Sequence, residues 1–362
     1  MLCGLLGAGC DSRSLPEAPA PEPQPVEAEV KFSLPVQIMA SARTAAGKQT
    51  PDEQAVSSLL AVAFNTDGAT APSTRTDGQN APEDDTTPFY AAVPIDVSSM
   101  MNPISDDDDE GDFSFGLGKE GTFYVCFLAN AKAELSEKLM QMTPGAFTIS
   151  QFKNYLADQD PGGADSDGGL LMTSRYFELT TSFTTPSYLG LVEMTRAMSR
   201  IDLQNGADGI NVTRILFYNR SDRTRLFNDK QTTLDSNCLQ TEPEEYNLAD
   251  TPLEGSAQKP ATLATPLYSY EQLASADDEE LPYLDIRYVM PSISATREYS
   301  HKVYFDTADG TPIPLKRNTL YHVNMVNRDG QPVFSIEVAD WEEGASVLIT
   351  DADLIGGVKA SH

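Results

Sequence analysis

The stretch that decides the fold class is Val30-Lys-Phe-Ser-Leu-Pro-Val-Gln-Ile38. Every second residue in it is large and apolar: Val30, Phe32, Leu34, Val36 and Ile38. A period of two over nine residues predicts a β-strand with one buried face. Pro35 has no N–H group to donate, so we expect this strand at the edge of a sheet.

Further short apolar or alternating runs follow, separated by turn-forming residues. They cover residues 58–64, 89–97, 121–128, 176–180, 189–203, 212–218, 267–270, 283–290, 301–305, 319–325, 334–341 and 346–349. Helical patterns are short and few, at 129–140 and 149–156. Many short strands with few helices predict a mainly β protein made of β-sandwiches. We expect two domains, at 30–188 and 189–343, with a tail at 344–362.

Composition limits the function classes. The chain has 362 residues, of which 40% are hydrophobic, enough for the cores of two ordinary domains. It carries 25 Lys and Arg against 54 Asp and Glu, a net charge of −29. A negative field of this size repels phosphate backbones, so we expect no nucleic-acid partner.

The first ten residues, MLCGLLGAGC, are typical of the end of a lipoprotein signal peptide. A short apolar run precedes Gly7-Ala8-Gly9, and Cys10 would then carry the lipid. Residues 1–10 are therefore predicted as a signal peptide, although an unprocessed apolar terminus stays open as an alternative. Residues 11–29 alternate Pro and Glu with small residues, which predicts an extended tether.

Catalytic and metal-binding signals are absent from the sequence. Three histidines occur, none at a metal-ligand spacing, and there is no phosphate loop or nucleophile elbow. The acidic runs 105–112 and 160–169 are interpreted as solvated loops, because the first lacks the Glu that closes an EF-hand. Cys126 lies in an apolar run and is expected to be a buried thiol. We expect no enzyme activity, no metal and no cofactor.

Seven groups of residues, taken in order, carry a resemblance to a known family. They are Cys10, Arg43, Phe64-Asn-Thr-Asp-Gly68, Phe123-Tyr-Val-Cys-Phe-Leu-Ala-Asn130, Met194-Thr-Arg-Ala-Met-Ser-Arg-Ile-Asp-Leu203, Lys316-Arg-Asn-Thr-Leu-Tyr321 and Ala339-Asp-Trp341. In this order and spacing, the chain resembles the FimA/Mfa-type fimbrillins, or type V pilins, of Bacteroidales. The resemblance covers nearly the whole chain and implies two transthyretin-like β-sandwich domains.

The resemblance further implies polymerisation by strand exchange. A lipoprotein precursor, lipidated on Cys10, would be cut by an Arg-specific protease between Arg43 and Thr44. The strand bearing Val30, Phe32, Leu34, Val36 and Ile38 would then be displaced by a donor strand of another subunit. The tail is the candidate donor, through Val347, Ile349, Leu354 and Ile355, or it packs as a final strand in its own domain.

These expectations also indicate the binding partners and the cellular location of the protein. The partners are other pilin subunits, the Arg-specific protease, the outer membrane through the lipid of the precursor, and an unknown surface receptor. The expected location is the outer membrane for the precursor and the fimbrium afterwards. Two alternatives stay open: an anchor or tip subunit of the same pilus, or a glycan-binding surface lipoprotein. The second needs an exposed aromatic platform, whereas the single Trp, Trp341, lies in a predicted strand.

Overall fold

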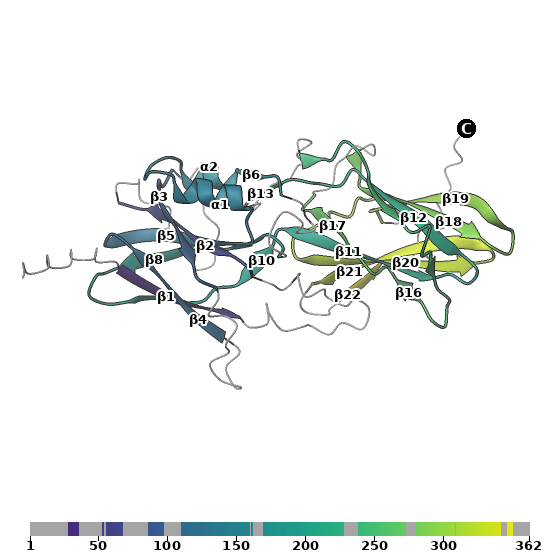
Figure 1. The fold of residues 1–362 in the computed structure, drawn as a ribbon, viewed down its shortest axis with the longest axis horizontal. Helices are drawn as coiled ribbons and strands as arrows, with labels where there is room; N and C mark the ends of the chain where they lie inside the picture. Colours follow the sequence, from purple (N-terminus) through teal and green to yellow (C-terminus); the bar gives the residue numbers. More distant parts are fainter. Residues whose placement is uncertain are drawn as a thin grey trace, which may run out of the picture.

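The computed structural model in Figure 1 shows an elongated molecule built almost entirely of strands. It describes residues 28–35, 53, 56–67, 86–97, 110–159, 161, 169–227, 238–272, 280–307, 309–341 and 346–349. The predicted mainly β class is confirmed. The described part of the chain contains two helices, both in its first half.

The first half of the chain forms two sheets. One has the strand order β4-β1-β9, and the other has β10-β7-β5-β2-β3 with β8 paired to β5. The bounds are β1 Ala28–Pro35, β2 Leu59–Asn65, β3 Phe89–Ile95, β4 Glu110–Leu117, β5 Gly121–Ala129, β6 Leu156–Ala157, β7 Met172–Ser174, β8 Phe177–Thr181, β9 Ser187–Leu191 and β10 Met194–Arg196. The helices are α1 Ala133–Met140 and α2 Ile149–Lys153.

The second half forms two more sheets. Their orders are β16-β11-β20-β21-β22, with β17 on β11, and β14-β12-β18-β19, with β15 on β12. The bounds are β11 Met198–Gly206, β12 Asn211–Tyr218, β13 Thr224–Arg225, β14 Glu244–Asn247, β15 Leu253–Glu254, β16 Ala261–Thr262, β17 Leu267–Tyr270, β18 Tyr283–Met290, β19 Ser294–Tyr304, β20 Thr319–Arg328, β21 Gln331–Asp340 and β22 Ser346–Ile349. A short β13–β6 ladder joins the two halves.

Strands β2 and β5 are buried on both faces, which explains why their sequences are continuously apolar rather than alternating. On β5, Phe123, Val125 and Phe127 point into the core shared with the β4-β1-β9 sheet. Tyr124 and Cys126 point the other way, into a core covered by α1 and α2. The first half is therefore three layers thick, with two helices, a central sheet and the small sheet that contains β1.

The helix α1 begins later than its apolar pattern predicts. Asn130 takes a left-handed backbone conformation, with φ of 55°, directly after β5. Its side-chain oxygen accepts a 2.8 Å bond from the Ser57 N–H, and its amide donates to the Leu170 carbonyl at 2.9 Å. Asn tolerates this conformation better than most residues, so it turns the chain out of the sheet before the helix starts.

Candidate functional site

Strand β1 is the central strand of its sheet. It pairs antiparallel with β4 over all eight residues, from Ala28 opposite Leu117 to Pro35 opposite Glu110. On its other side it pairs in parallel with β9, as far as Ser33. The prediction of an edge strand is therefore wrong. Pro35 is tolerated because it is the last residue of β1 and lies beyond the β9 pairing, where no ladder bond needs its N–H.

The inner face of β1 closes the core of the first half. Ala28 and Val30 are both fully buried. Val30 belongs to one hydrophobic cluster with aromatic side chains of β4 and β5, namely Phe113, Phe115, Phe123 and Phe127. We call the space between β4 and β9 above these four rings the β1 groove. Removal of β1 would expose the apolar floor of the β1 groove and would leave one edge of β4 and one edge of β9 unpaired.

The predicted site residues lie partly in and partly outside the described ranges. Val30 is buried in β1, and the backbones of Phe32 and Leu34 pair with Phe113 and Gly111 of β4. The remaining residues predicted for the displaced strand, lipidation, cleavage and the end of the tail lie outside the described residues: Val36, Ile38, Cys10, Arg43, Thr44, Leu354 and Ile355.

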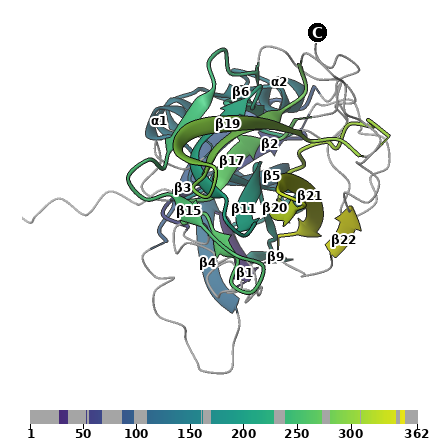
Figure 2. The ribbon, with the colours of Figure 1, turned by 90° about the vertical axis from the view of Figure 1, so that its right-hand side faces the viewer.

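The start of the tail forms strand β22 at the outer edge of the second half (Figure 2). It pairs antiparallel with β21, with Val347 opposite Val338 and Ile349 opposite Ile336. In this structure, two of the four residues predicted for the donor strand therefore lie in the final strand of their own half. Among the residues that the structure describes, only β21 pairs with β22.

Three of the resemblance motifs meet where the two halves join. The Arg196 guanidinium lies 4.8 Å from the ring centre of Trp341 and donates a 2.9 Å hydrogen bond to the side chain of Asn318. The Tyr268 ring stacks on Trp341 at 6.3 Å. Asn318 has φ of 52°, the left-handed conformation that Asn adopts at turns. We call this set, together with Arg200 and Glu53, the junction cluster.

Glu53 is the residue of the junction cluster that the sequence did not indicate. Its carboxylate is buried and lies 2.6 Å from an Arg200 nitrogen, and it also accepts a hydrogen bond from the Tyr268 hydroxyl. Its backbone carbonyl accepts a 3.1 Å bond from Arg196. Arg200 in turn holds Asp202 through two bonds of 2.7 and 3.1 Å. Arg200 thus binds two carboxylates, whereas Arg196 binds the Glu53 carbonyl.

Burial and pairing act in opposite directions in this cluster. Burial raises the pKa of the Glu53 carboxyl, against the opposing charge of Arg200. Burial also lowers the pKa of Arg200, but the bonds and charges of Asp202 and Glu53 outweigh it, so the net shift is upward. Glu53 lies in a polar stretch without periodicity, and its partners are more than 140 residues away. No local signal could have identified it.

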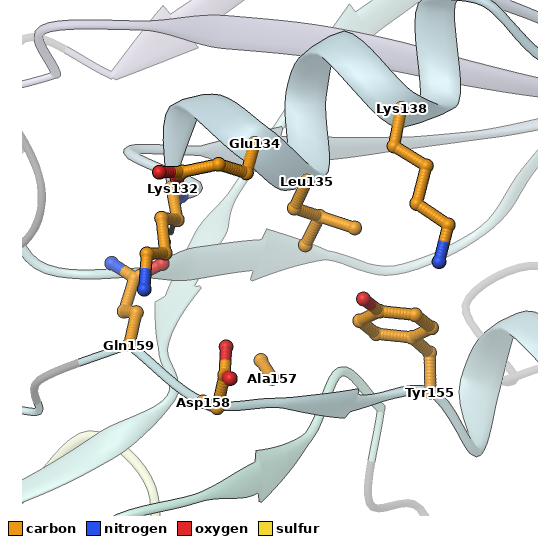
Figure 3. A pocket seen from close by; sticks show the side chains of 8 residues that line it. All are labelled: Lys132, Glu134, Leu135, Lys138, Tyr155, Ala157, Asp158 and Gln159. Carbon is orange, nitrogen blue, oxygen red and sulfur yellow. Dashed lines mark hydrogen bonds between the residues drawn. The ribbon is translucent and has the colours of Figure 1, made fainter.

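A cavity of about 330 Å³ lies between α1 and the chain around β6 (Figure 3). Its lining mixes charged side chains of both signs with aliphatic and aromatic ones. Its lining residues are Lys132, Glu134, Leu135, Lys138, Tyr155, Ala157, Asp158 and Gln159. The Lys138 amino group lies over the Tyr155 ring, 5.3 Å from its centre.

A row of tyrosines crosses the outer sheet of the second half. The rings of Tyr218 and Tyr283 stack at 4.7 Å, and those of Tyr283 and Tyr304 lie 4.9 Å apart. Lys302 places its amino group 4.9 Å from the Tyr283 ring centre. The first pair is stacked, the second is tilted, and all three rings are half-buried. Trp341 is 2% exposed and cannot provide an aromatic platform.

The acidic runs give no metal centre in the part of the chain that the structure describes. Residues 105–109 and 162–168 lie outside it, while Glu110–Leu117 is strand β4. Across the described ranges, no three side chains of His, Cys, Asp or Glu gather as metal ligands would. No helix in these ranges is long and apolar enough to span a membrane.

Comparison with known proteins points to one family. No curated protein matches the sequence significantly. A crystal structure of a candidate cell adhesion protein from Parabacteroides distasonis is similar, with a TM-score of 0.53 and 13% identity, covering 88% of this chain and 97% of that one. The C-terminally truncated tip fimbrial protein Mfa3 from Porphyromonas gingivalis gives 0.50 and 14%, covering 86% and 100%. At such identities, these likenesses show the fold alone.

The sequence itself supplies the family. Residues 28–214, which are 187 of the 362, match the family described as "Major fimbrial subunit protein (FimA)". The match starts at the first residue of β1 and includes every strand of the first half, as well as β11 and half of β12. This chain therefore belongs to the FimA family of major fimbrial subunit proteins.

Proposed function

We propose that this chain is a structural subunit of a bacterial surface fimbria, exported as a lipoprotein precursor and polymerised by donor-strand exchange. Membership of the family implies assembly with other pilin subunits in a fimbrium at the cell surface. The observation that best supports the finer proposal is the seat of β1 between β4 and β9, over an apolar floor.

The proposed sequence of steps begins at the membrane. A lipid on Cys10 holds the precursor at the outer membrane, with residues 11–29 as spacer. An Arg-specific protease then cuts between Arg43 and Thr44. The cut separates β1, with its lipid, from the rest of the chain, so that only non-covalent contacts keep β1 in the groove.

Those contacts explain why exchange requires a replacement strand. An empty groove leaves rows of unpaired N–H and C=O groups on both β4 and β9. Each large apolar side chain that leaves the core costs about 1.5–3 kcal/mol. An incoming strand with alternating apolar residues removes both penalties as it displaces β1, which is β-strand addition.

The tail is the proposed donor, through Val347, Ile349, Leu354 and Ile355. Because β22 is the outermost strand and, among the described residues, pairs only with β21, its release costs fewer backbone bonds than the release of β1. We propose neither an enzyme activity nor a cofactor for this chain. We retain the division into two domains as a proposal. The expected boundary between 188 and 189 would cut β9, whereas the sheets change between β10 and β11.

The test uses the precursor without its signal peptide, residues 11–362. The protein is incubated with a limiting amount of Arg-specific protease, followed by N-terminal sequencing and an unheated denaturing gel. We expect a new terminus at Thr44 and a ladder of multimers that collapses on heating.

The Arg43→Ala precursor is the matched control, and it should yield neither the Thr44 terminus nor the ladder. A Thr44 terminus without multimers would contradict a shaft subunit and favour an anchor or tip role. A protected Arg43 in the parent precursor would contradict the cleavage step itself.

A further inference from the structure

The cavity between α1 and the chain around β6, here called the α1 cavity, is lined by charged side chains that do not pair with each other. Among the residues that the structure describes, Glu134, Lys138 and Asp158 form no ion pair and no side-chain hydrogen bond. Glu134 and Lys138 even have the i, i+4 spacing and the order that favour an ion pair on a helix. Lys138 instead lies over the Tyr155 ring. The cavity therefore offers both signs of charge to a ligand.

Figure 3 shows that the two signs lie at different ends of the α1 cavity. Lys138 and the Tyr155 hydroxyl lie at one end, where N–H and O–H donors suit a carboxylate. Glu134 and Asp158 lie toward the other end, where carboxylates suit an ammonium group. The buried side chain of Leu135 lies between the two ends and offers an apolar contact.

The charge of the lining indicates a ligand without net charge. Lys132 is the fourth charged residue of the lining, which thus holds two cations and two anions. The whole chain carries a net charge of −29, and a field of that sign repels an anionic ligand. A ligand with one positive and one negative group therefore fits the α1 cavity better than a simple anion does.

The spacing of the charges indicates the length of the ligand. Positions 134 and 138 are about 6 Å apart along the axis of α1, since a helix rises about 1.5 Å per residue. In a free amino acid, the amino nitrogen and the carboxyl carbon are only about 2.5 Å apart. In an extended dipeptide, the two charged groups are about 6–7 Å apart. A cavity of about 330 Å³ is at the small end of ligand sites, which also suits a dipeptide.

We infer that the α1 cavity binds a dipeptide as a zwitterion, with its carboxylate at Lys138 and Tyr155 and its amino group at Glu134 and Asp158. This would be a binding function additional to assembly, and it does not rest on the proposed strand exchange. The helices cover one face of the central sheet, and the sheet that contains β1 covers the other. Replacement of β1 therefore leaves the lining of the α1 cavity in place.

The ligand is tested by isothermal titration calorimetry of residues 11–362 with the dipeptide Ala-Leu. We expect one molecule to bind per chain. N-acetyl-Ala-Leu and Ala-Leu amide each lack one charge and should bind roughly tenfold more weakly or worse, because each loses a charge-assisted hydrogen bond. Free leucine should also bind at least roughly tenfold more weakly, since its two charges are too close together. The neutral disaccharide maltose should not bind.

Three results of these titrations would overturn the inference. The first is no heat of binding with Ala-Leu up to about 10 mM. The second is equal affinity for the free and the blocked dipeptides, because the charges of the ligand would then not be recognised. The third is binding of maltose in place of Ala-Leu, which would make the α1 cavity a sugar site.

Variants test whether the α1 cavity is the site. Lys138→Gln and Asp158→Asn each remove one charge from opposite ends, and each should weaken Ala-Leu binding roughly tenfold. Glu137→Gln is the matched control, since Glu137 is exposed on α1 but does not line the cavity, and its affinity should stay within about twofold of the parent. The emission spectrum of Trp341 should be the same in all variants, as a check of folding. Parent-like affinity in both Lys138→Gln and Asp158→Asn would overturn the assignment to this cavity.

The orientation of the dipeptide has a separate test. Lys138→Gln should weaken binding of Ala-Leu but not of Ala-Leu amide, which has no carboxylate for Lys138 to bind. Asp158→Asn should weaken binding of Ala-Leu but not of N-acetyl-Ala-Leu, which has no ammonium group. The opposite pattern would overturn the orientation, with the amino group of the ligand then lying at the Lys138 end.

Discussion

Glu53 ties the chain downstream of the proposed cut to the second half of the molecule. It follows Arg43 by ten residues, yet its carboxylate and carbonyl bind arginines of β10 and β11. The proposed release of β1 would therefore leave the new N-terminus anchored nine residues from its end. The anchor consists of buried charges, whose cost of desolvation is offset only while every member has its partner.

Glu53→Ala should lower the free energy of unfolding by about 3–5 kcal/mol, because it leaves Arg200 with one carboxylate fewer in a buried site. Denaturant unfolding followed by fluorescence suits this test, since Trp341 is the single Trp and lies in the junction cluster. Glu245→Ala is the control, as it breaks an exposed pair with Arg214 worth at most about 1 kcal/mol. Equal losses for the two variants would contradict the anchor.

Cys126 offers a second test at single-residue scale. It is fully buried, and burial raises the pKa of its thiol far above the usual range, so the reactive thiolate is scarce. In residues 11–362, Cys126 and Cys238 are the only cysteines. Iodoacetamide at pH 8 should leave Cys126 unmodified in the native protein and modify it fully in denaturant, as read by mass spectrometry of peptides. Rapid labelling of the native protein would show that the core around β2 and β5 opens readily.

At the scale of elements, local sequence patterns predict where strands lie better than they predict which strands pair with each other. The alternation from Val30 and the continuous apolar run from Phe123 both predict strands that the structure contains. Pro35 favours an edge position for the first of these strands, but its neighbours come from distant residues, 110–117 and 187–191. β4 gives only a weak local signal, because acidic residues lead into it and hide the alternation of Phe113, Phe115 and Leu117.

Strand β22 can be fixed to β21 by an engineered disulfide. Val338 and Val347 lie opposite each other on antiparallel strands, where Cα atoms are about 4.5–5.5 Å apart and within reach of a disulfide. If Val347 leaves β21 to enter another subunit, Val338→Cys with Val347→Cys should block the ladder when oxidised and permit it when reduced. The Val347→Cys single variant controls for the substitution. A ladder that forms in both redox states would show that only residues beyond 349 donate.

At the scale of the whole molecule, β1 and β22 lie in different halves of one elongated body (Figure 1). β22 runs from the position of Ala339 toward that of Ile336, and so away from Trp341 in the junction cluster. The sequence motifs do not reveal the direction of β22, because that direction depends on the pairing of β11 with β20 and of β20 with β21. Under the proposed function, one chain would accept a strand in its first half and donate a strand from its second half, as a shaft subunit must.

The net negative charge of each subunit opposes the proposed polymerisation. Each copy of the sequence carries a net charge of −29, so two approaching subunits repel each other at long range. Screening lengths fall from about 30 Å at 0.01 M salt to about 10 Å at 0.1 M, which removes most of that repulsion but leaves apolar contacts intact. After cleavage, polymerisation should therefore speed up several-fold between 0.01 and 0.15 M NaCl. To separate assembly from proteolysis, the protease is inhibited before the salt is changed, and dimer formation is followed on unheated gels. Rates that fall with added salt would mean that opposite charges attract across the interface between subunits, contrary to the expected repulsion.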